Sequence, residues 1–221
     1  MQKKVAVILS GCGVYDGTEI HESVITLLRL DQRGAKAQCF APDIPQLHVV
    51  NHLTGEEAGE SRNVLVESAR IARGEVKNVT ELQAADFDAL IIPGGFGAAK
   101  NLSNFASAGG ACQVQPEVLR AARDFASAGK PVGLMCIAPT MAVQIFGPGV
   151  TCTLGSDEGI ANTVTQMGAV HQDCLVGDII EDPQHKLVST PAYMLAQSIS
   201  EAAGGIYKLV DRILELTHPA E

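Results

Sequence analysis

Residues 4–41, KVAVILSGCGVYDGTEIHESVITLLRLDQRGAKAQCFA, hold the pattern that decides the fold. Lys4–Ser10 is a short run rich in β-branched residues that stops at a glycine, which is typical of a buried parallel strand. Thr18–Arg33 has apolar residues near helical spacing, and Gly34 stands where a glycine commonly ends a helix. Lys36–Ala41 is a second strand-like run, stopped by a proline. These three segments predict one βαβ unit.

The same alternation continues and predicts a parallel sheet with helices on both faces. Further strands are expected at residues 87–93, 132–135 and 150–154, and a hairpin-like pair of strands is expected within 173–190. Helices are expected at residues 61–73, 116–128, 141–146 and 160–167. A long helix is expected at 192–216, interrupted at Gly204-Gly205. The chain has no internal repeat and no linker-like change in composition. We therefore predict a single α/β domain over residues 1–221 with an open, mostly parallel central sheet.

The composition excludes several classes of protein. Of the 221 residues, 46% are hydrophobic and 19% are charged, which excludes a disordered chain. The 16 basic and 25 acidic side chains give a net charge of −9, so the chain lacks the basic face that nucleic acids and anionic membranes require. No segment reaches the ~20 apolar residues of a membrane span. We expect neither a nucleic-acid partner nor membrane association.

The cysteines and the first residues of the sequence bear on localisation. The six cysteines form no C-x-x-C pair; they are Cys12, Cys39, Cys112, Cys136, Cys152 and Cys174. The apolar run after Lys3 and Lys4 is too short for the apolar region of a signal peptide followed by a cleavage site. Without a secretion signal the cysteines are expected to be free thiols in a reducing compartment. These observations predict a cytoplasmic protein.

The strongest chemical signal is Pro131–Thr140, PVGLMCIAPT. A buried strand ends at Cys136 and a helix follows directly, which is the arrangement of a nucleophile elbow at the carboxyl edge of a sheet. The amides of the following helix can lower the pKa of the Cys136 thiol, so we expect this cysteine to be alkylated faster than the other five. The alternative is that Cys136 is a small buried apolar residue.

A second signal is Pro93–Leu102, PGGFGAAKNL. Three glycines after a strand allow backbone amides to approach a ligand closely. Neither a P-loop nor a G-x-G-x-x-G motif is present, so a phosphate cradle is disfavoured. We interpret the segment as half of an oxyanion hole, in which the amides of Gly95 and Ile137 face a carbonyl oxygen at Cys136. The alternative is a plain strand-to-helix turn.

Two further patterns suggest ligand sites that we do not expect to exist. Residues 11–17, GCGVYDG, nearly match the dinucleotide fingerprint but have one residue too many before the third glycine. His48 and His52 have the i, i+4 spacing of a zinc helix, but its glutamate and a third ligand are missing. We therefore predict no nucleotide cofactor and no metal.

Carboxylates surround the start of the helix predicted at residues 18–33. Asp16 and Glu19 are expected to cap its N-terminus, where negative charge is favourable. Glu22 lies one turn deeper in the helix and need not be a capping residue. Of the three acids, Glu22 is therefore the one whose presence capping does not explain.

Together these motifs resemble the ThiJ/PfpI superfamily, a branch of the class I glutamine amidotransferase-like proteins. The features common to the superfamily are PGGFGAAKNL and the LMCIAPT of residues 134–140. Narrower motifs are similar to the ElbB branch of that superfamily: VILSGCGVYDGTEIHE at 7–22, FAPD at 40–43, NHLTGE at 51–56 and TPAYMLAQ at 190–197. The resemblance covers essentially the whole chain.

The resemblance implies a flavodoxin-like three-layer sandwich, a homodimer and no cofactor. The nucleophile of the family maps to Cys136, and the helix-borne acid that hydrogen-bonds the sulfur maps to Glu22. The oxyanion-hole amides map to Gly95 and Ile137. Members of the ElbB branch are associated with a glyoxalase activity that converts glyoxal to glycolate without glutathione, and a protein-deglycase role has also been proposed for them.

The chain departs from the superfamily at the histidine that its peptidases and some glyoxalases carry beside the cysteine or on the following strand. The two positions hold Ile137 and Asp157, so no Cys-His-acid triad is visible and peptidase or glutaminase activity is not expected. His21, His171 and Asp157 remain candidates for proton transfer. His21 precedes Glu22 on the predicted helix and is expected to face away from it.

Two functions are compatible with these residues. In the first, the protein is an enzyme: Cys136 adds to an aldehyde carbon of glyoxal and Glu22 moves a proton. Its pocket is expected to be small and polar, with room for two or three carbons. In the second, the protein is a non-enzymatic redox sensor or interaction protein, because an accessible thiol of low pKa also suits oxidation sensing. The missing histidine favours the second function and the presence of Glu22 favours the enzyme, which is the function we expect.

Overall fold

A seven-stranded sheet forms the centre of the fold in residues 2–217, the part of the chain that the computed structural model describes; Met1 and residues 218–221 lie outside it. In spatial order the strands are β3 (Val76–Asn78), β2 (Lys36–Ala41), β1 (Lys4–Ile8), β4 (Ala89–Ile92), β5 (Val132–Met135), β9 (Leu187–Thr190) and β8 (Ile180–Asp182). All neighbours are parallel except β8 and β9. This confirms the predicted α/β class with a mostly parallel, flavodoxin-like sheet.

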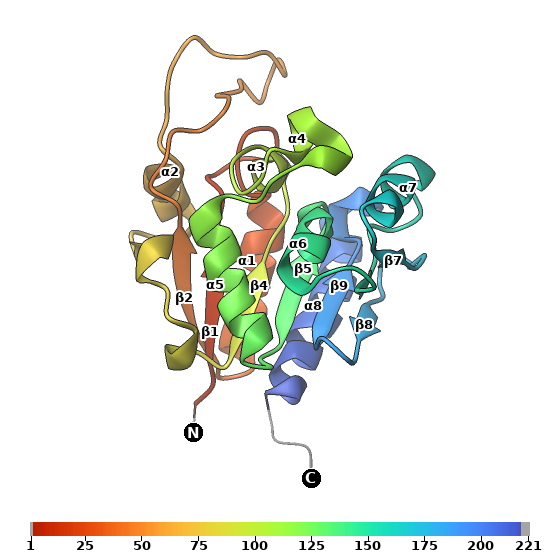
Figure 1. The fold of residues 1–221 in the computed structure, drawn as a ribbon. Helices are drawn as coiled ribbons and strands as arrows, with labels where there is room; N and C mark the ends of the chain where they lie inside the picture. Colours follow the sequence, from red (N-terminus) through yellow and green to blue (C-terminus); the bar gives the residue numbers. More distant parts are fainter. Residues whose placement is uncertain (1, 218–221) are drawn as a thin grey trace.

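Helices cover both faces of the sheet (Figure 1). On one face lie α1 (Ile20–Gln32) and α8 (Ile199–Leu216), and on the other α5 (Pro116–Ser127) and α6 (Ala142–Phe146). Shorter helices are α2 (Val64–Ile71), α3 (Phe96–Lys100), α4 (Phe105–Ala108) and α7 (Glu158–Gln166). Single 3-10 turns lie at residues 79–81, 84–86, 109–111, 138–141 and 192–194. Within residues 2–217 no helix is both long and apolar enough to cross a membrane.

The alternation of side chains along β1 explains the two covered faces. Val5 and Val7 lie in the core beneath α1 and α8, whereas Ala6 and Ile8 lie in the core on the α5 side. All four side chains are fully buried. A strand that is buried on both faces has a continuous run of apolar residues, and this is why β1 could be predicted from the sequence.

The predicted elements around residue 150 and in the last third need partial correction. The strand expected at 150–154 shrinks to β6 (Thr151–Cys152), which pairs with β7 (Val170–His171) in a separate small sheet. The hairpin-like pair is confirmed as β8 and β9, although it is shorter than residues 173–190. The sequence patterns did not predict β3, α3 or α4, which contain three to five residues each.

The interruption predicted at Gly204-Gly205 is wrong, because α8 continues through both glycines. At Gly205, an added Cβ atom would clash with Oγ1 of Thr190 and lie 2.7 Å from the carbonyl oxygen of Val176. Gly205 therefore allows α8 to pack closely against the end of β9, and it does not break the helix. The break lies earlier, between the 3-10 turn at 192–194 and the Ser198 side chain that caps α8.

Candidate active site

Cys136 directly follows β5 at the carboxyl edge of the sheet, and it has the strained backbone of a nucleophile elbow. Its φ is +59°, a value that residues other than glycine rarely adopt. Its amide donates a hydrogen bond to the carbonyl of Thr190 on β9, 3.0 Å away, and the 3-10 turn at 138–141 follows. The elbow geometry predicted from PVGLMCIAPT is therefore present.

The carboxyl group of Glu22 on α1 lies beside the Cys136 sulfur and is fully buried. Its Oε2 accepts a hydrogen bond from the Gly94 amide at 2.8 Å, and its Oε1 accepts one from the Tyr193 amide at 3.2 Å. A Cβ atom added at Gly94 would lie 2.8 Å from Oε2 of Glu22 and 2.9 Å from Sγ of Cys136. The absence of a side chain at Gly94 thus leaves the space in which the acid meets the thiol.

Two glycine-rich loops hold this geometry by packing backbone against backbone. The amide of Gly97 donates to the carbonyl of Gly17 at 2.8 Å, and the amide of Glu19 donates to the carbonyl of Gly94 at 3.0 Å. Within the first loop, the Gly17 amide donates to the carbonyl of Gly13 at 2.7 Å. These three amides are therefore engaged by backbone carbonyls within the protein. The two sequence motifs form one structural unit.

We predict that Gly17→Ala destabilises the protein by about 3 kcal/mol, because overpacking against rigid backbone cannot be relieved by a rotamer change. An added Cβ would clash with the amide nitrogen of Cys12 and lie 2.8 Å from the carbonyl carbon of Gly11. Urea denaturation measures the effect. Gly59→Ala is the matched control, because nothing lies within 4 Å of a Cβ added there. Equal stability of the two variants would contradict the packing argument.

The backbone amides of Gly95 and Ile137 both donate hydrogen bonds toward the Cys136 sulfur and lower its pKa, although other effects outweigh them. Gly95 has a φ of +89° and is the N-cap residue of α3, whereas Ile137 follows Cys136 directly. The two donors come from different loops and converge on one atom. An oxygen on a carbon bonded to this sulfur would lie near both donors, so the oxyanion hole at Gly95 and Ile137 stays a prediction.

The pKa of the Cys136 thiol is raised well above its usual value, first by burial and then by the charge of Glu22. Our expectation of a lowered pKa is therefore wrong: the helix amides are present, but desolvation of the thiolate outweighs them. Burial, followed by the charge of Glu19, raises the pKa of Glu22 to about 8. At neutral pH the pair therefore holds both protons, and the form with one shared proton appears as the pH approaches 8.

This correction changes the order in which we expect the thiols to react. Among residues 2–217, Cys12 is the one cysteine that is partly exposed, while Cys136 is buried. Because alkylation requires access as well as thiolate, we predict that Cys12 reacts before Cys136 at pH 7. Brief iodoacetamide treatment followed by peptide mapping measures the order. Faster modification of Cys136 would show that its thiolate is more populated and more accessible than its burial implies.

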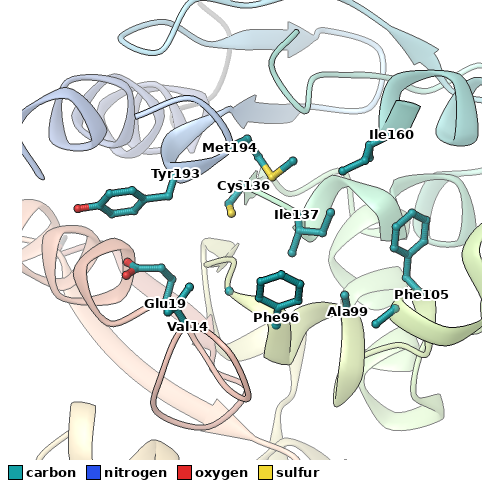
Figure 2. A pocket seen from close by; sticks show the side chains of 12 residues that line it. Val14, Glu19, Phe96, Ala99, Phe105, Cys136, Ile137, Ile160, Tyr193 and Met194 are labelled. Atoms are coloured by element: carbon teal, nitrogen blue, oxygen red, sulfur yellow. The ribbon is translucent and has the colours of Figure 1, made fainter. Parts of the chain in front are cut away.

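A cavity of about 440 Å³ opens beside Cys136 (Figure 2). Its walls are mostly apolar and come from several elements, with Val14, Glu19, Gly95, Phe96, Ala99, Phe105, Ala106, Cys136, Ile137, Ile160, Tyr193 and Met194 as lining residues. The prediction of a small, polar pocket is therefore wrong. The quoted motifs contain the polar groups of the site and several apolar lining residues, such as Phe96 and Ile137, whereas Phe105, Ala106 and Ile160 lie outside them.

The remaining acids that we considered have structural contacts. Glu19 caps α1 as predicted, since its Oε2 accepts the Glu22 amide at 2.7 Å. Asp16 does not cap α1; its Oδ2 instead accepts the amide of Val50 at 2.7 Å and holds the 42–63 segment. Asp157 caps α7 through the amide of Ile160 and does not line the cavity.

No histidine in residues 2–217 lines the cavity. His171 accepts the amide of Leu154 at 3.1 Å, which occupies its Nε2. His21 is exposed whereas Glu22 is buried, and the Nδ1 of His21 lies 2.7 Å from the hydroxyl of Tyr193.

His48 and His52 lie in the irregular 42–63 segment rather than on a helix. The Nε2 of His52 accepts the amide of Tyr15 at 3.2 Å, whereas that of His48 lies 3.5 Å from Glu57. Among residues 2–217, no three histidine, cysteine, aspartate or glutamate side chains are grouped as metal ligands would be.

Tyr193 is a site residue that the motifs did not single out. Its amide holds Glu22, its side chain lines the cavity, and its hydroxyl contacts His21. The preceding residue, Ala192, has a φ of +44°, so the chain turns sharply where β9 gives way to the 3-10 turn. The signal available in the sequence was the TPAYMLAQ motif at the end of a predicted strand.

The fold and the site define an α/β protein with a cysteine nucleophile elbow and a buried acid. A human protein, "Glutamine amidotransferase-like class 1 domain-containing protein 3, mitochondrial", is 48% identical over 227 residues, covering 97% of this chain and 83% of the human one. The crystal structure of an Ehrlichia chaffeensis "isoprenoid biosynthesis protein with amidotransferase-like domain" is 39% identical with a TM-score of 0.91, covering 98% of this chain and all of that one.

The crystal structure of a DJ-1 superfamily protein from Salmonella typhimurium matches with a TM-score of 0.61 at 21% identity, covering 97% of this chain and 91% of that one, and so shares the fold alone. No protein-family model matches the chain. The chain belongs to the glutamine amidotransferase-like class 1 proteins, in their ElbB-like branch, and it has the fold of the DJ-1 superfamily. This confirms the resemblance seen in the sequence motifs.

The prediction of a cytoplasmic protein is contradicted by these relatives. The human relative and the ES1 proteins of Rattus norvegicus and Danio rerio are all named mitochondrial. The inference failed because six free thiols indicate a reducing environment without identifying the compartment that provides it.

Proposed function

We propose that the protein is a cofactor-independent glyoxalase that converts glyoxal to glycolate through a hemithioacetal on Cys136. The observation that supports this most is the buried Glu22 carboxyl beside the Cys136 sulfur, with the amides of Gly95 and Ile137 directed at the same atom. A nucleophile, a proton carrier and an oxyanion hole are the three parts that the reaction needs. Fold families of this type include enzymes.

The first step forms the carbon–sulfur bond. In the form of the pair that holds one proton, the Glu22 carboxylate removes that proton from the Cys136 thiol as the sulfur attacks one aldehyde carbon of glyoxal. The new oxyanion accepts hydrogen bonds from the Gly95 and Ile137 amides, and each such donor contributes roughly 3 kcal/mol to transition-state stability. Glu22 then gives its proton to that oxygen and becomes a carboxylate.

The second step moves hydrogen between the two carbons. The Glu22 carboxylate removes the hydrogen of the hemithioacetal carbon as a proton, and an enediolate forms. Glu22 returns the proton to the adjacent carbon, while the hydroxyl proton of the first carbon passes to the oxygen of the second. The first carbon is oxidised to a thioester and the second is reduced to an alcohol, so no external oxidant or reductant is needed. Water then cleaves the carbon–sulfur bond, releases glycolate and restores the one-proton pair.

The alternative of a redox sensor is less well supported. Sensor cysteines are accessible and have a low pKa. Cys136 is only 7% exposed, and burial raises its pKa. A deglycase acting on whole proteins would also have to bring a bulky modified side chain to this buried sulfur, and no observation specifically favours that role.

Saturation kinetics of glycolate formation from glyoxal test the proposal. We expect a saturable rate with a kcat/KM of ~10⁴ M⁻¹s⁻¹ or more, the lower end for enzymes. A rate that stays linear in glyoxal concentration with a far smaller second-order constant would be the reactivity of a plain thiol. That result would favour a non-enzymatic role.

We further propose that the protein is a homodimer, as the family resemblance implies. One face of α1 presents Ile20, Val24 and Leu28, which are 41%, 48% and 45% exposed and repeat at helical spacing.

Val24→Glu is expected to convert a dimer of the 23.2 kDa chain to a monomer, because it places a charge in the contact. Light scattering measures the mass, with Leu53→Glu on the surface as control. A monomeric wild type would refute this proposal.

A further inference from the structure

The cavity beside Cys136 is larger than glyoxal requires. Its volume is about 440 Å³. Glyoxal has four non-hydrogen atoms and fills roughly 60–90 Å³ if a water molecule is counted as about 30 Å³. Sites for ligands many times larger have volumes of about 300–1,000 Å³. Glyoxal bound at Cys136 would therefore leave most of the cavity filled with water against apolar walls.

Polar and apolar groups lie at different ends of this cavity (Figure 2). Glu19 and Tyr193 lie at one end, with Val14 beside Glu19; the Cys136 sulfur lies between, and Phe105 and Ile160 lie at the other end. Phe105 belongs to α4 and Ile160 to α7, so two separate elements supply the apolar end. A ligand held at the sulfur would place its polar atoms toward Glu19 and an apolar group toward Phe105 and Ile160.

Phe96 extends the apolar surface toward the sulfur. It is the first residue of α3, its ring lines the cavity between Glu19 and Phe105, and it is 50% exposed. Aromatic side chains gain most from burial, so a half-exposed ring facing a cavity marks apolar area that a ligand can cover. Ala99, one turn further along α3, leaves space beside the ring.

We propose that the preferred substrates are 2-oxoaldehydes whose ketone carbon carries an aryl or branched alkyl group. This inference rests on the proposed glyoxalase function and extends it to a substrate class. The aldehyde carbon bonds to sulfur, its oxygen faces the amides of Gly95 and Ile137, and the substituent lies against Phe105 and Ile160. The opposite orientation would place an apolar group against the Glu19 carboxyl.

The chemistry of a larger substrate balances as it does for glyoxal. Sulfur adds to the aldehyde carbon, and the hydrogen of that carbon moves as a proton through Glu22 to the ketone carbon. The aldehyde carbon is oxidised to a thioester while the ketone carbon is reduced to a secondary alcohol. Water cleaves the thioester to a 2-hydroxy acid and the free thiol, so phenylglyoxal gives mandelate.

Phenylglyoxal and glyoxal are the pair of substrates that test the inference. Each kcat/KM is divided by the rate of hemithioacetal formation with free N-acetylcysteine, which removes the intrinsic reactivity of the aldehyde. We expect the corrected value to be at least ~10-fold higher for phenylglyoxal, as burial of an aromatic ring predicts. Ile160→Asn should lower the ratio ~5-fold or more. Ile199→Asn, the same substitution at a half-exposed isoleucine outside the cavity, should leave the ratio unchanged.

A binding measurement separates this inference from the proposed function. In the Cys136→Ser background, 2-hydroxyacetophenone should bind at least ~10-fold more tightly than hydroxyacetone in calorimetry, and Ile160→Asn should remove the difference. If this preference is found but no oxoaldehyde is turned over, the apolar site stands and the glyoxalase proposal fails. If glyoxal is turned over as well as phenylglyoxal and the two ketones bind equally, the inference is overturned and the glyoxalase proposal stands.

Discussion

Glu22→Gln lowers the turnover of glyoxal by ~10²-fold or more, while the Cys136 thiol stays open to alkylation. The glutamine side chain keeps the size of Glu22, one of its two acceptor oxygens and a hydrogen-bond donor, but it cannot carry a proton between the two carbons of the substrate. Turnover and the alkylation rate of Cys136, both measured from pH 6 to pH 9, report the two properties separately. Glu22→Ala should lose both, because it also removes the hydrogen bonds to Gly94 and Tyr193.

A control and a contrary result define this prediction. Glu56→Gln makes the same chemical change at an exposed glutamate and should leave turnover unchanged. If Glu22→Gln retains full turnover, Glu22 only positions the thiol and the proton carrier lies elsewhere. The next residue to test would then be Glu19, which lines the cavity, because His171 and Asp157 do not.

The second large effect is on stability. As the pH rises from 5 to 9, the free energy of unfolding of the wild-type protein falls relative to that of Glu22→Gln. Burial, and then the charge of Glu19, raise the pKa of Glu22 from 4.5 to about 8 in the folded protein. A group with a raised folded-state pKa binds more protons when folded, so its stabilising contribution is complete below pH 4.5 and is lost as the pH passes 8. At 1.36 kcal/mol for each pKa unit, the whole change is on the order of 5 kcal/mol.

Urea denaturation of both proteins across this pH range measures the difference. The two stability curves should converge or cross toward high pH, where ionisation of Glu22 costs the wild type most. Glu56→Gln again serves as control and should give a curve parallel to that of the wild type. A constant difference between wild type and Glu22→Gln from pH 5 to pH 9 would mean that Glu22 ionises in the folded protein as it does in the unfolded chain.

The sequence predicted the elements that are buried on both faces and the residues at their carboxyl ends. β1, β4 and β5 are unbroken apolar runs, so their positions were visible, and Cys136 follows one of them directly. The resemblance placed Glu22 beside the cysteine as the helix-borne acid of the family. These features depend on local pattern or on a motif, and both can be read from one segment at a time.

The apolar wall of the cavity could not be predicted in the same way. Phe96, Phe105 and Ile160 come from α3, α4 and α7, and α3 and α4 are too short to show a helical period. The raised pKa of Cys136 was missed for a related reason. The amides that lower it are local to the elbow, whereas the burial that raises it depends on α1 and the 93–97 and 190–194 segments packing around the sulfur.

Glycolate formation from glyoxal by the wild type and by Cys136→Ser tests the central claim most directly. Serine keeps the shape of the elbow and the hydrogen bonds of its backbone, but its hydroxyl is a far weaker nucleophile than a thiol at this site. We predict that turnover falls by ~10³-fold or more, to the level of the uncatalysed reaction, while the stability of the fold changes little. Glycolate formed by Cys136→Ser at the wild-type rate would show that Cys136 is not the nucleophile.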